Sequence, residues 1–182
     1  MTLEMVLTIL LAGFLSNNYA LLHFLGTGAV IENERSSRRS VIVGAGTTIV
    51  MVLSTLITWP INKYVLGNAT YLQTLVFVIV VMLVAELVHL LAKKHIEGYC
   101  KVYTPTFAIN GALLGLCIHN TELAFGEALV TAAGVGIGLM VTMTVFSSLH
   151  NKIDEESLPK AFRGLPISLL IAGLMALALL AF

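Results

Sequence analysis

Six long apolar runs constrain this chain more than any other feature of its sequence. A helix of about 20 apolar residues is long enough to cross the hydrocarbon core of a bilayer. Only 11% of the 182 residues are charged, against about 25% in soluble domains. The sequence therefore predicts an all-α integral membrane protein with a single membrane domain, residues 1–182. The predicted spans are roughly 3–28, 40–60, 72–92, 102–119, 128–149 and 164–182.

The first apolar run lacks the features of a cleavable signal peptide. No Lys or Arg precedes it, Glu4 stands there instead, and no small-x-small cleavage pattern follows. We therefore expect this run to stay in the membrane as a helix.

The basic residues predict the orientation of the six spans. Nine of the ten Lys and Arg residues fall in the loops at 29–39, 93–101 and 150–163, and only Lys63 lies on the other face. Because loops rich in Lys and Arg stay in the cytoplasm, both termini are expected outside. The same basic loops suit contact with anionic lipid headgroups, and a docking surface for a cytoplasmic partner is the alternative.

The two cysteines do not predict a disulfide. Cys100 and Cys117 are separated by a mostly helical stretch, which places them on the order of 25 Å apart. Each is interpreted as a small apolar packing residue.

A shift of 92 residues brings out an internal repeat. It aligns Asn18 with Asn110 and places Val43, Gly44, Gly46 and Met51 on Val135, Gly136, Gly138 and Met143. Each half then has three spans, and an odd number inserts the second half in the opposite sense. The sequence predicts two inverted three-helix repeats, at about 1–92 and 93–182.

Polar residues interrupt the first and fourth spans. Ser16, Asn17 and Asn18 lie inside the first span, and Pro105 and Asn110 lie inside the fourth. Asn competes for backbone hydrogen bonds and proline cannot donate one, so both spans are predicted to be broken helices that meet near the midplane. The alternative is two intact helices joined by Asn hydrogen bonds.

Small residues recur in the second and fifth spans. The glycines are Gly44, Gly46, Gly134, Gly136 and Gly138. Small side chains let helices approach closely in lipid, so these positions are interpreted as packing contacts.

Several motifs together resemble one family. The chain is similar to the RnfA/NqrE family, whose members belong to the Rnf ion-translocating oxidoreductase and to the sodium-pumping NADH:quinone oxidoreductase. The resemblance covers nearly the whole chain. It is carried by Asn17-Asn18-Tyr19 with Phe24-Leu25-Gly26, by Tyr71-Leu72-Gln73-Thr74-Leu75, by Pro105, Asn110, Ala112 and Gly115, and by residues 158–164 and 171–177.

The resemblance implies a non-catalytic subunit of a translocase. Such a complex couples ferredoxin or NADH oxidoreduction to movement of Na⁺ or H⁺ and contains flavins and iron–sulfur clusters. The implied partners are a homologous membrane subunit of opposite topology (RnfE/NqrD-like), other Rnf-type subunits and the lipid of the inner (plasma) membrane. No nucleic-acid partner is expected.

Two glycines stand where the family has the cysteines of a midplane iron–sulfur centre. These are Gly28 and Gly111, and glycine offers no thiolate for iron. We therefore expect no metal ligand from this chain. The partner supplies all ligands, the electron path bypasses this site, or the chain is a divergent paralogue; the sequence leaves these alternatives open.

Ionisable and amide side chains inside the spans are candidate ion-path residues. Glu86 and His89 are three residues apart and share a helix face, and charges inside a membrane mark ion paths or ion pairs. The alternative is that both reach toward water near the cytoplasmic boundary. Asn17, Asn18 and Asn110 could bind Na⁺ or cap the broken helices. His23 is interpreted as a structural histidine or a residue of the midplane cavity.

Two other functions stay open beside the redox-pump subunit. One is a small inverted-repeat ion transporter without redox chemistry, an alternative that the absence of both family cysteines keeps open. The other is a structural paralogue inside the pump. If subunits that contain flavin and iron co-purify with this chain, the two functions within the pump are supported and the transporter is not.

Overall fold

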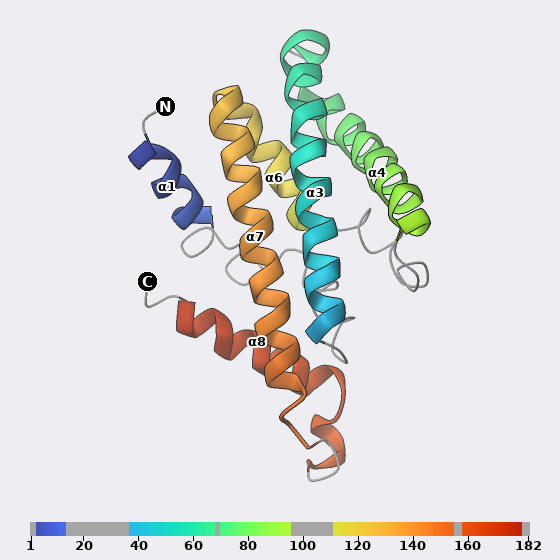
Figure 1. Cartoon of the computed structure of the whole chain (residues 1–182), viewed down its shortest axis with the longest axis vertical. Coiled ribbons are helices and arrows are strands. Elements are labelled where there is room, and N and C mark those ends of the chain that lie inside the picture. The colour runs from blue at the N-terminus through green and yellow to red at the C-terminus, as the bar shows by residue number, and fades with distance from the viewer. Residues whose placement is uncertain (1–2, 14–36, 68–69, 96–110, 155–157, 180–182) are drawn as a thin grey trace.

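The computed structural model describes residues 3–13, 37–67, 70–95, 111–154 and 158–179, and over these ranges its regular structure is helical (Figure 1). The prediction of an all-α protein is confirmed. The α-helices of this described part are α1 (Leu3–Leu11), α3 (Ser37–Ile61), α4 (Thr70–His95), α6 (Gly111–His119), α7 (Phe125–His150) and α8 (Leu165–Leu179).

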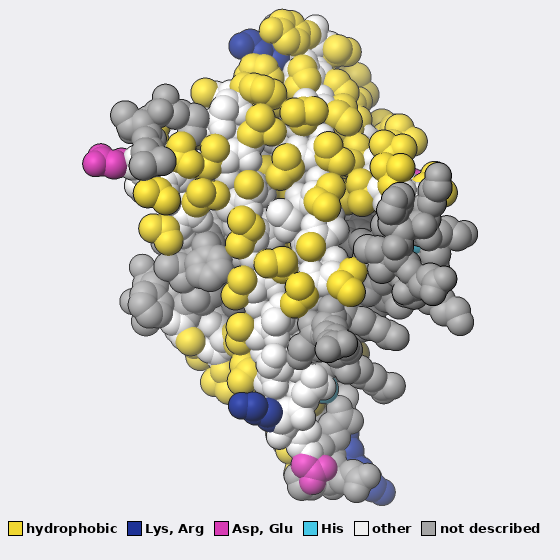
Figure 2. All heavy atoms as spheres, in the orientation of Figure 1, with side chains coloured by type: hydrophobic (Ala, Val, Ile, Leu, Met, Phe, Trp, Pro, Cys, Tyr) yellow, Lys and Arg dark blue, Asp and Glu magenta, His cyan; other side chains and the backbone are white. Residues whose placement is uncertain are grey.

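Three of the described helices are long and apolar enough to cross a membrane. They cover Ser40–Leu66, Tyr71–Leu91 and Phe125–His150, which match the predicted second, third and fifth spans. The apolar part of α8, Leu165–Ala178, is shorter. Figure 2 shows hydrophobic side chains over the middle of one face, with Lys and Arg toward the two ends of the molecule. This distribution is that of an integral membrane protein.

The described parts of helices α1 and α6 are short. Each has nine residues, or about 13 Å of helix against a hydrocarbon core of about 30 Å. Helix α1 packs on α7, and α6 packs on α3 and α4 (Figure 1). The breaks predicted at 16–18 and 105–110 lie outside the described residues and stay predictions.

Proline and glycine end helix α3. Pro60 lies in its last turn and has no N–H for the helical hydrogen bond. A π-helical turn, Asn62–Leu66, follows, and the Gly67 N–H donates to the Asn62 carbonyl at 3.2 Å. Gly67 then takes a φ of 46°, a conformation that glycine reaches without steric cost. The chain can therefore turn back into α4.

Helices α3 and α7 form the centre of the molecule and run antiparallel (Figure 1). Their backbones approach closely at glycines on both sides. A Cβ on Gly44 would lie 2.6 Å from Met140 Cα, and one on Gly136 would lie 2.9 Å from Thr48 Cα. The interpretation of Gly44 and Gly136 as packing positions is confirmed.

These two contacts are related by the 92-residue shift. It moves Gly44 onto Gly136 and Thr48 onto Met140, so the contact of Gly44 with Met140 becomes the contact of Gly136 with Thr48. A two-fold axis between α3 and α7 produces such a pair of contacts.

The pattern of buried residues repeats with the same shift of 92 residues. Ten positions of α3 are buried between residues 40 and 58, and each has a buried counterpart 92 residues later in α7. The two helices therefore bury equivalent faces, which supports an inverted repeat. The repeat boundaries at about 1–92 and 93–182 stay a prediction.

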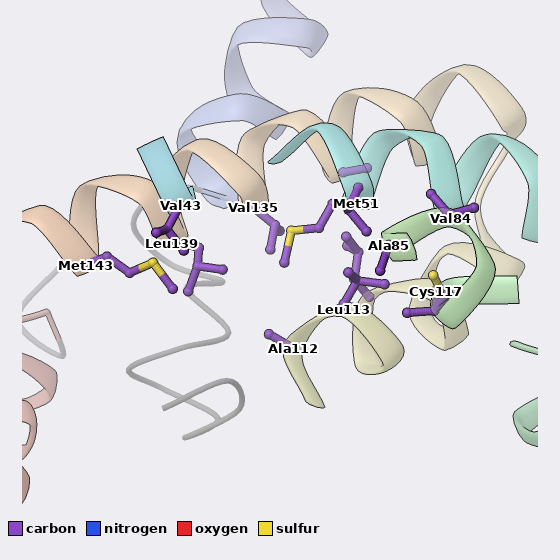
Figure 3. Packing of buried hydrophobic residues seen from close by; sticks show 14 of the residues in the cluster. Val43, Met51, Val84, Ala85, Ala112, Leu113, Cys117, Val135, Leu139 and Met143 are labelled. Atoms are coloured by element: carbon purple, nitrogen blue, oxygen red, sulfur yellow. The ribbon is translucent and has the colours of Figure 1, made fainter. Parts of the chain in front are cut away.

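The buried core lies where α3, α4, α6 and α7 meet. Figure 3 shows Val43 and Leu139 side by side, and Leu113 and Cys117 near Ala85. Hydroxyl groups inside the long helices bond back to their own backbone: Thr47 Oγ1 donates to the Val43 carbonyl at 2.8 Å, and Thr144 Oγ1 to the Met140 carbonyl at 2.8 Å. Such bonds satisfy polar groups within one helix.

Candidate functional site

Most of the predicted midplane residues lie outside the described part of the chain. This holds for Asn17, Asn18, Gly28 and Asn110, and for His23. Gly111 is described and is the first residue of α6. The predicted meeting of two half-helix ends is therefore not tested and stays a proposal.

Glu86 and His89 both lie on α4, as predicted. Glu86 is exposed, and His89, one turn further, is partly buried. The pair lies within the apolar span Tyr71–Leu91. The carboxylate therefore lies on a helix whose other residues suit contact with lipid or with another apolar helix.

The described residues do not fit an iron–sulfur centre. Gly111 has no side chain, and the nearest thiol in sequence among them, that of Cys117, is six residues further along the helix, about 9 Å along its axis. Cys117 is buried against hydroxyl groups of α3. Among the described residues, no group of three His, Cys, Asp or Glu side chains could hold a metal ion.

A buried amide joins three elements of the fold. Asn120 is 1% exposed and opens the 3₁₀ turn Asn120–Glu122, which follows α6. Its Nδ2 donates to Thr55 Oγ1 at 3.2 Å and to the Ala128 carbonyl at 3.2 Å. One side chain thus joins α3, the end of α6 and the start of α7.

Further hydroxyl groups of α3 lie in the same region. The Cys117 thiol has hydrogen-bond contacts with Thr58 and Thr55. Ser54 Oγ and Asn120 Oδ1 are buried and have no hydrogen-bond partner among the described residues. Because the Ala128 carbonyl can only accept a hydrogen bond, the Asn120 atom that faces it is the donor Nδ2.

Sequence reasoning missed this polar group. Its signal was three hydroxyl residues, Ser54, Thr55 and Thr58, within two turns of a predicted span. Asn120 lies just beyond the predicted fourth span, which ends at residue 119, and the position of a polar residue between two spans gives no sign of burial. In the structure, residues 120–122 form a turn between α6 and α7 that packs on α3 and α7.

An aromatic anchor joins the ends of α3 and α7 beside this group. Trp59 Nε1 donates to the Leu123 carbonyl at 3.0 Å, and the Trp59 and Phe125 ring centroids are 5.0 Å apart. The Lys63 amine lies 4.7 Å from the centre of the Trp59 ring. Tryptophan and lysine in this arrangement are typical of a membrane–water boundary. The end of α3 and the turn before α7 therefore lie at the same face of the molecule, as six alternating spans require.

The fold and its polar groups define a class. Long apolar helices and hydroxyl groups bonded within their own helix are features of an all-α integral membrane protein. Comparison with known sequences then identifies the family. The chain belongs to the Rnf-Nqr family, because the profile described as "Rnf-Nqr subunit, membrane protein" matches residues 6–182.

Curated relatives match over nearly the full length. The A-type subunit of the Na(+)-translocating ferredoxin:NAD(+) oxidoreductase complex of Acetobacterium woodii is 30% identical over 96% of this chain and 94% of its own. Its counterpart in the ion-translocating oxidoreductase complex of Syntrophotalea carbinolica is 32% identical over 97% and 95%. The counterpart in the proton-translocating ferredoxin:NAD(+) oxidoreductase complex of Clostridium ljungdahlii is 30% identical over 97% and 95%. The resemblance predicted from sequence motifs is confirmed.

Proposed function

We propose that this chain is the A-type membrane subunit of an Rnf-type complex, which couples ferredoxin or NADH oxidoreduction to translocation of Na⁺ or H⁺. One observation carries the proposal: the A-type subunits of such complexes match this chain from end to end at about 30% identity. In this role the chain is a non-catalytic part of the translocase.

The proposed assembly contains a homologous membrane subunit of opposite topology together with further Rnf-type subunits that hold flavins and iron–sulfur clusters. Gly111 supplies no ligand; in the proposed assembly, a midplane metal centre would take its protein ligands from the partner. The proposed location is the inner membrane. Both termini face outward, since nine of ten basic residues occupy the loops of the opposite face.

Purification tests the proposal. The tagged chain, extracted anaerobically in mild detergent, is expected to bring with it several subunits that contain flavin and iron, identified by mass spectrometry and cofactor assay. Recovery of a colourless, iron-free chain, alone or with one homologue, contradicts the redox-pump function. That result would favour a small inverted-repeat transporter, the alternative that the absence of the family cysteines keeps open.

Glu86 is the proposed ion-path residue, with His89 as its neighbour one turn away. A carboxylate inside an apolar span is costly and persists where it serves an ion or a partner group. The Glu86→Gln variant is expected to assemble normally and to lose at least about tenfold in cation-dependent ion transport by the complex in proteoliposomes, a barrier increase of about 1.4 kcal/mol.

Glu122→Gln is the matched control, because Glu122 is an exposed carboxylate at the end of the 3₁₀ turn after α6. Its ion transport is expected to equal that of the wild type. Full transport by Glu86→Gln would contradict the ion-path role and leave Glu86 as a residue that reaches toward water.

A further inference from the structure

Ser54 Oγ and Asn120 Oδ1 are buried polar atoms that bond to no side chain or backbone group of the described residues. Ser54 is 0% exposed and Asn120 is 1% exposed. Ser54 lies inside the apolar span Ser40–Leu66. A polar atom without a hydrogen bond is strongly unfavourable in such surroundings, so each of these two oxygens requires an explanation.

Both atoms belong to one cluster of polar side chains around Thr55. Thr55 follows Ser54 in α3, and its Oγ1 accepts a hydrogen bond from Asn120 Nδ2 at 3.2 Å. Thr58 lies one turn after Ser54 and donates to the Ser54 carbonyl at 2.8 Å. The Cys117 thiol, on the helix that precedes Asn120, contacts both threonine hydroxyls. We name the residues Ser54, Thr55, Thr58 and Asn120 the α3 polar group.

The partner of these two oxygens must be enclosed by the fold. All four residues of the α3 polar group are at most 1% exposed, so a lipid headgroup or a side chain of another subunit cannot reach them. Trp59 lies four residues beyond Thr55, about 6 Å along the helix axis, and its Nε1 is bonded to the Leu123 carbonyl at 3.0 Å. Only a small molecule or ion, held inside the protein, satisfies these conditions.

The available hydrogen bonds favour water over a cation. Asn120 Oδ1 can only accept, Thr58 Oγ1 has donated its hydrogen and can still accept, and the Ser54 hydroxyl can donate. A water molecule donates two hydrogen bonds and accepts others, and buried waters make about three. A hard cation takes about six oxygen ligands, and the α3 polar group has no carboxylate to offset the loss of the cation's hydration.

We infer that the α3 polar group binds one buried water molecule, which accepts a hydrogen bond from Ser54 Oγ and donates one to Asn120 Oδ1. Thr58 Oγ1 is its third partner. The water completes a polar contact between α3 and the turn that joins α6 to α7. This inference is independent of the proposed function, because it follows from the side chains of this chain alone.

The sign of the change caused by Ser54→Ala tests the inference. If Ser54 Oγ bonds to a water, the alanine variant leaves that water with fewer partners. The melting temperature of the purified full-length chain in detergent is then expected to fall by about 2–6 °C. If Ser54 Oγ has no partner, its removal eliminates an unsatisfied atom, and the melting temperature stays the same or rises. An unchanged or raised melting temperature therefore overturns the inference.

Ser148→Ala is the matched control, because it makes the same substitution inside another long helix. Ser148 is exposed on α7, and its Oγ donates to the Thr144 carbonyl at 2.8 Å. Its melting temperature is expected to lie within about 2 °C of the wild type. The control measures the effect of alanine on the helix, which is subtracted from the effect of Ser54→Ala.

A density map of the chain at about 2 Å resolution locates the bound molecule directly. A peak about 2.6–3.1 Å from both Ser54 Oγ and Asn120 Oδ1 is expected. The absence of that peak, in a map that shows other ordered waters, overturns the inference. A bound cation would instead have shorter contacts to about six oxygens, and NaCl in place of choline chloride at equal ionic strength would raise the melting temperature of the wild type. Either of these results also overturns the assignment of water.

Discussion

Replacing Gly44 by alanine is expected to lower the melting temperature of the purified chain by about 2–8 °C. The new Cβ would lie 2.6 Å from Met140 Cα and 2.7 Å from Met140 Cβ. Because Met140 Cα belongs to the backbone, a rotamer change cannot relieve the clash, and α3 must move away from α7. Overpacking of this kind costs about 1–3 kcal/mol, and each kcal/mol lowers the melting temperature by about 2–4 °C in a chain of this size.

Helix propensity acts in the opposite direction. Alanine is favoured over glycine inside a helix by about 1 kcal/mol, so the sign of the change depends on the space around the new methyl group. Gly173→Ala is the matched control, because a Cβ on Gly173 in α8 meets no atom within 4 Å. That variant is expected to be as stable as the wild type or more stable. The melting temperatures of all variants are measured by a fluorescence-detected melting assay.

The symmetric position provides a second variant. Gly136→Ala would place a Cβ 2.9 Å from Thr48 Cα, and a loss of similar size is expected. Wild-type melting of both alanine variants would contradict the close approach of α3 and α7.

Replacing Asn120 by leucine is expected to destabilise the protein by about 2–4 kcal/mol. The change removes the hydrogen bonds to Thr55 Oγ1 and to the Ala128 carbonyl and leaves these two groups without their donor. A buried group left unsatisfied costs about 1–3 kcal/mol, and leucine, of similar size, limits the contribution of a cavity. Denaturation of the purified protein in mixed micelles, followed by circular dichroism, measures the loss.

A double-mutant cycle separates the hydrogen bond from general packing. Thr55→Val keeps the shape of the side chain and removes its hydroxyl, and the coupling energy between positions 55 and 120 is expected to be about 1 kcal/mol. Thr121→Ala is the control, because the exposed Thr121 hydroxyl donates to the Ile118 carbonyl in the turn before it; its expected effect is within about 0.5 kcal/mol. Additive losses at positions 55 and 120 would show that Asn120 does not act through Thr55.

The parts of the fold that the sequence predicted correctly follow from composition and spacing. The length of the apolar runs in the sequence predicted α3, α4 and α7, because the thickness of the bilayer sets how long a spanning helix must be. The small residues of two spans predicted that Gly44 and Gly136 pack helices, because a small residue in a span has few other uses. Asn17, Asn18 and Asn110, in contrast, lie where the structure describes nothing that tests them.

The parts that escaped prediction depend on contacts between segments far apart in the chain. Asn120 looks like any polar loop residue, and its burial follows from Thr55, 65 residues away in the sequence. The exposure of Glu86 was also beyond sequence reasoning, because a weakly amphipathic membrane helix does not reveal which side its neighbours cover. In a bilayer both sides of such a helix are apolar.

The paired glycine contacts of α3 and α7 give the chain the character of a tethered dimer. Each half contributes one glycine and one partner residue to the same seam, Gly44 and Thr48 from the first half, Gly136 and Met140 from the second. The peptide link between the halves raises their effective concentration and forms no part of that seam. Two halves made as separate polypeptides are therefore expected to pair through this seam, provided that they enter the membrane in opposite orientations.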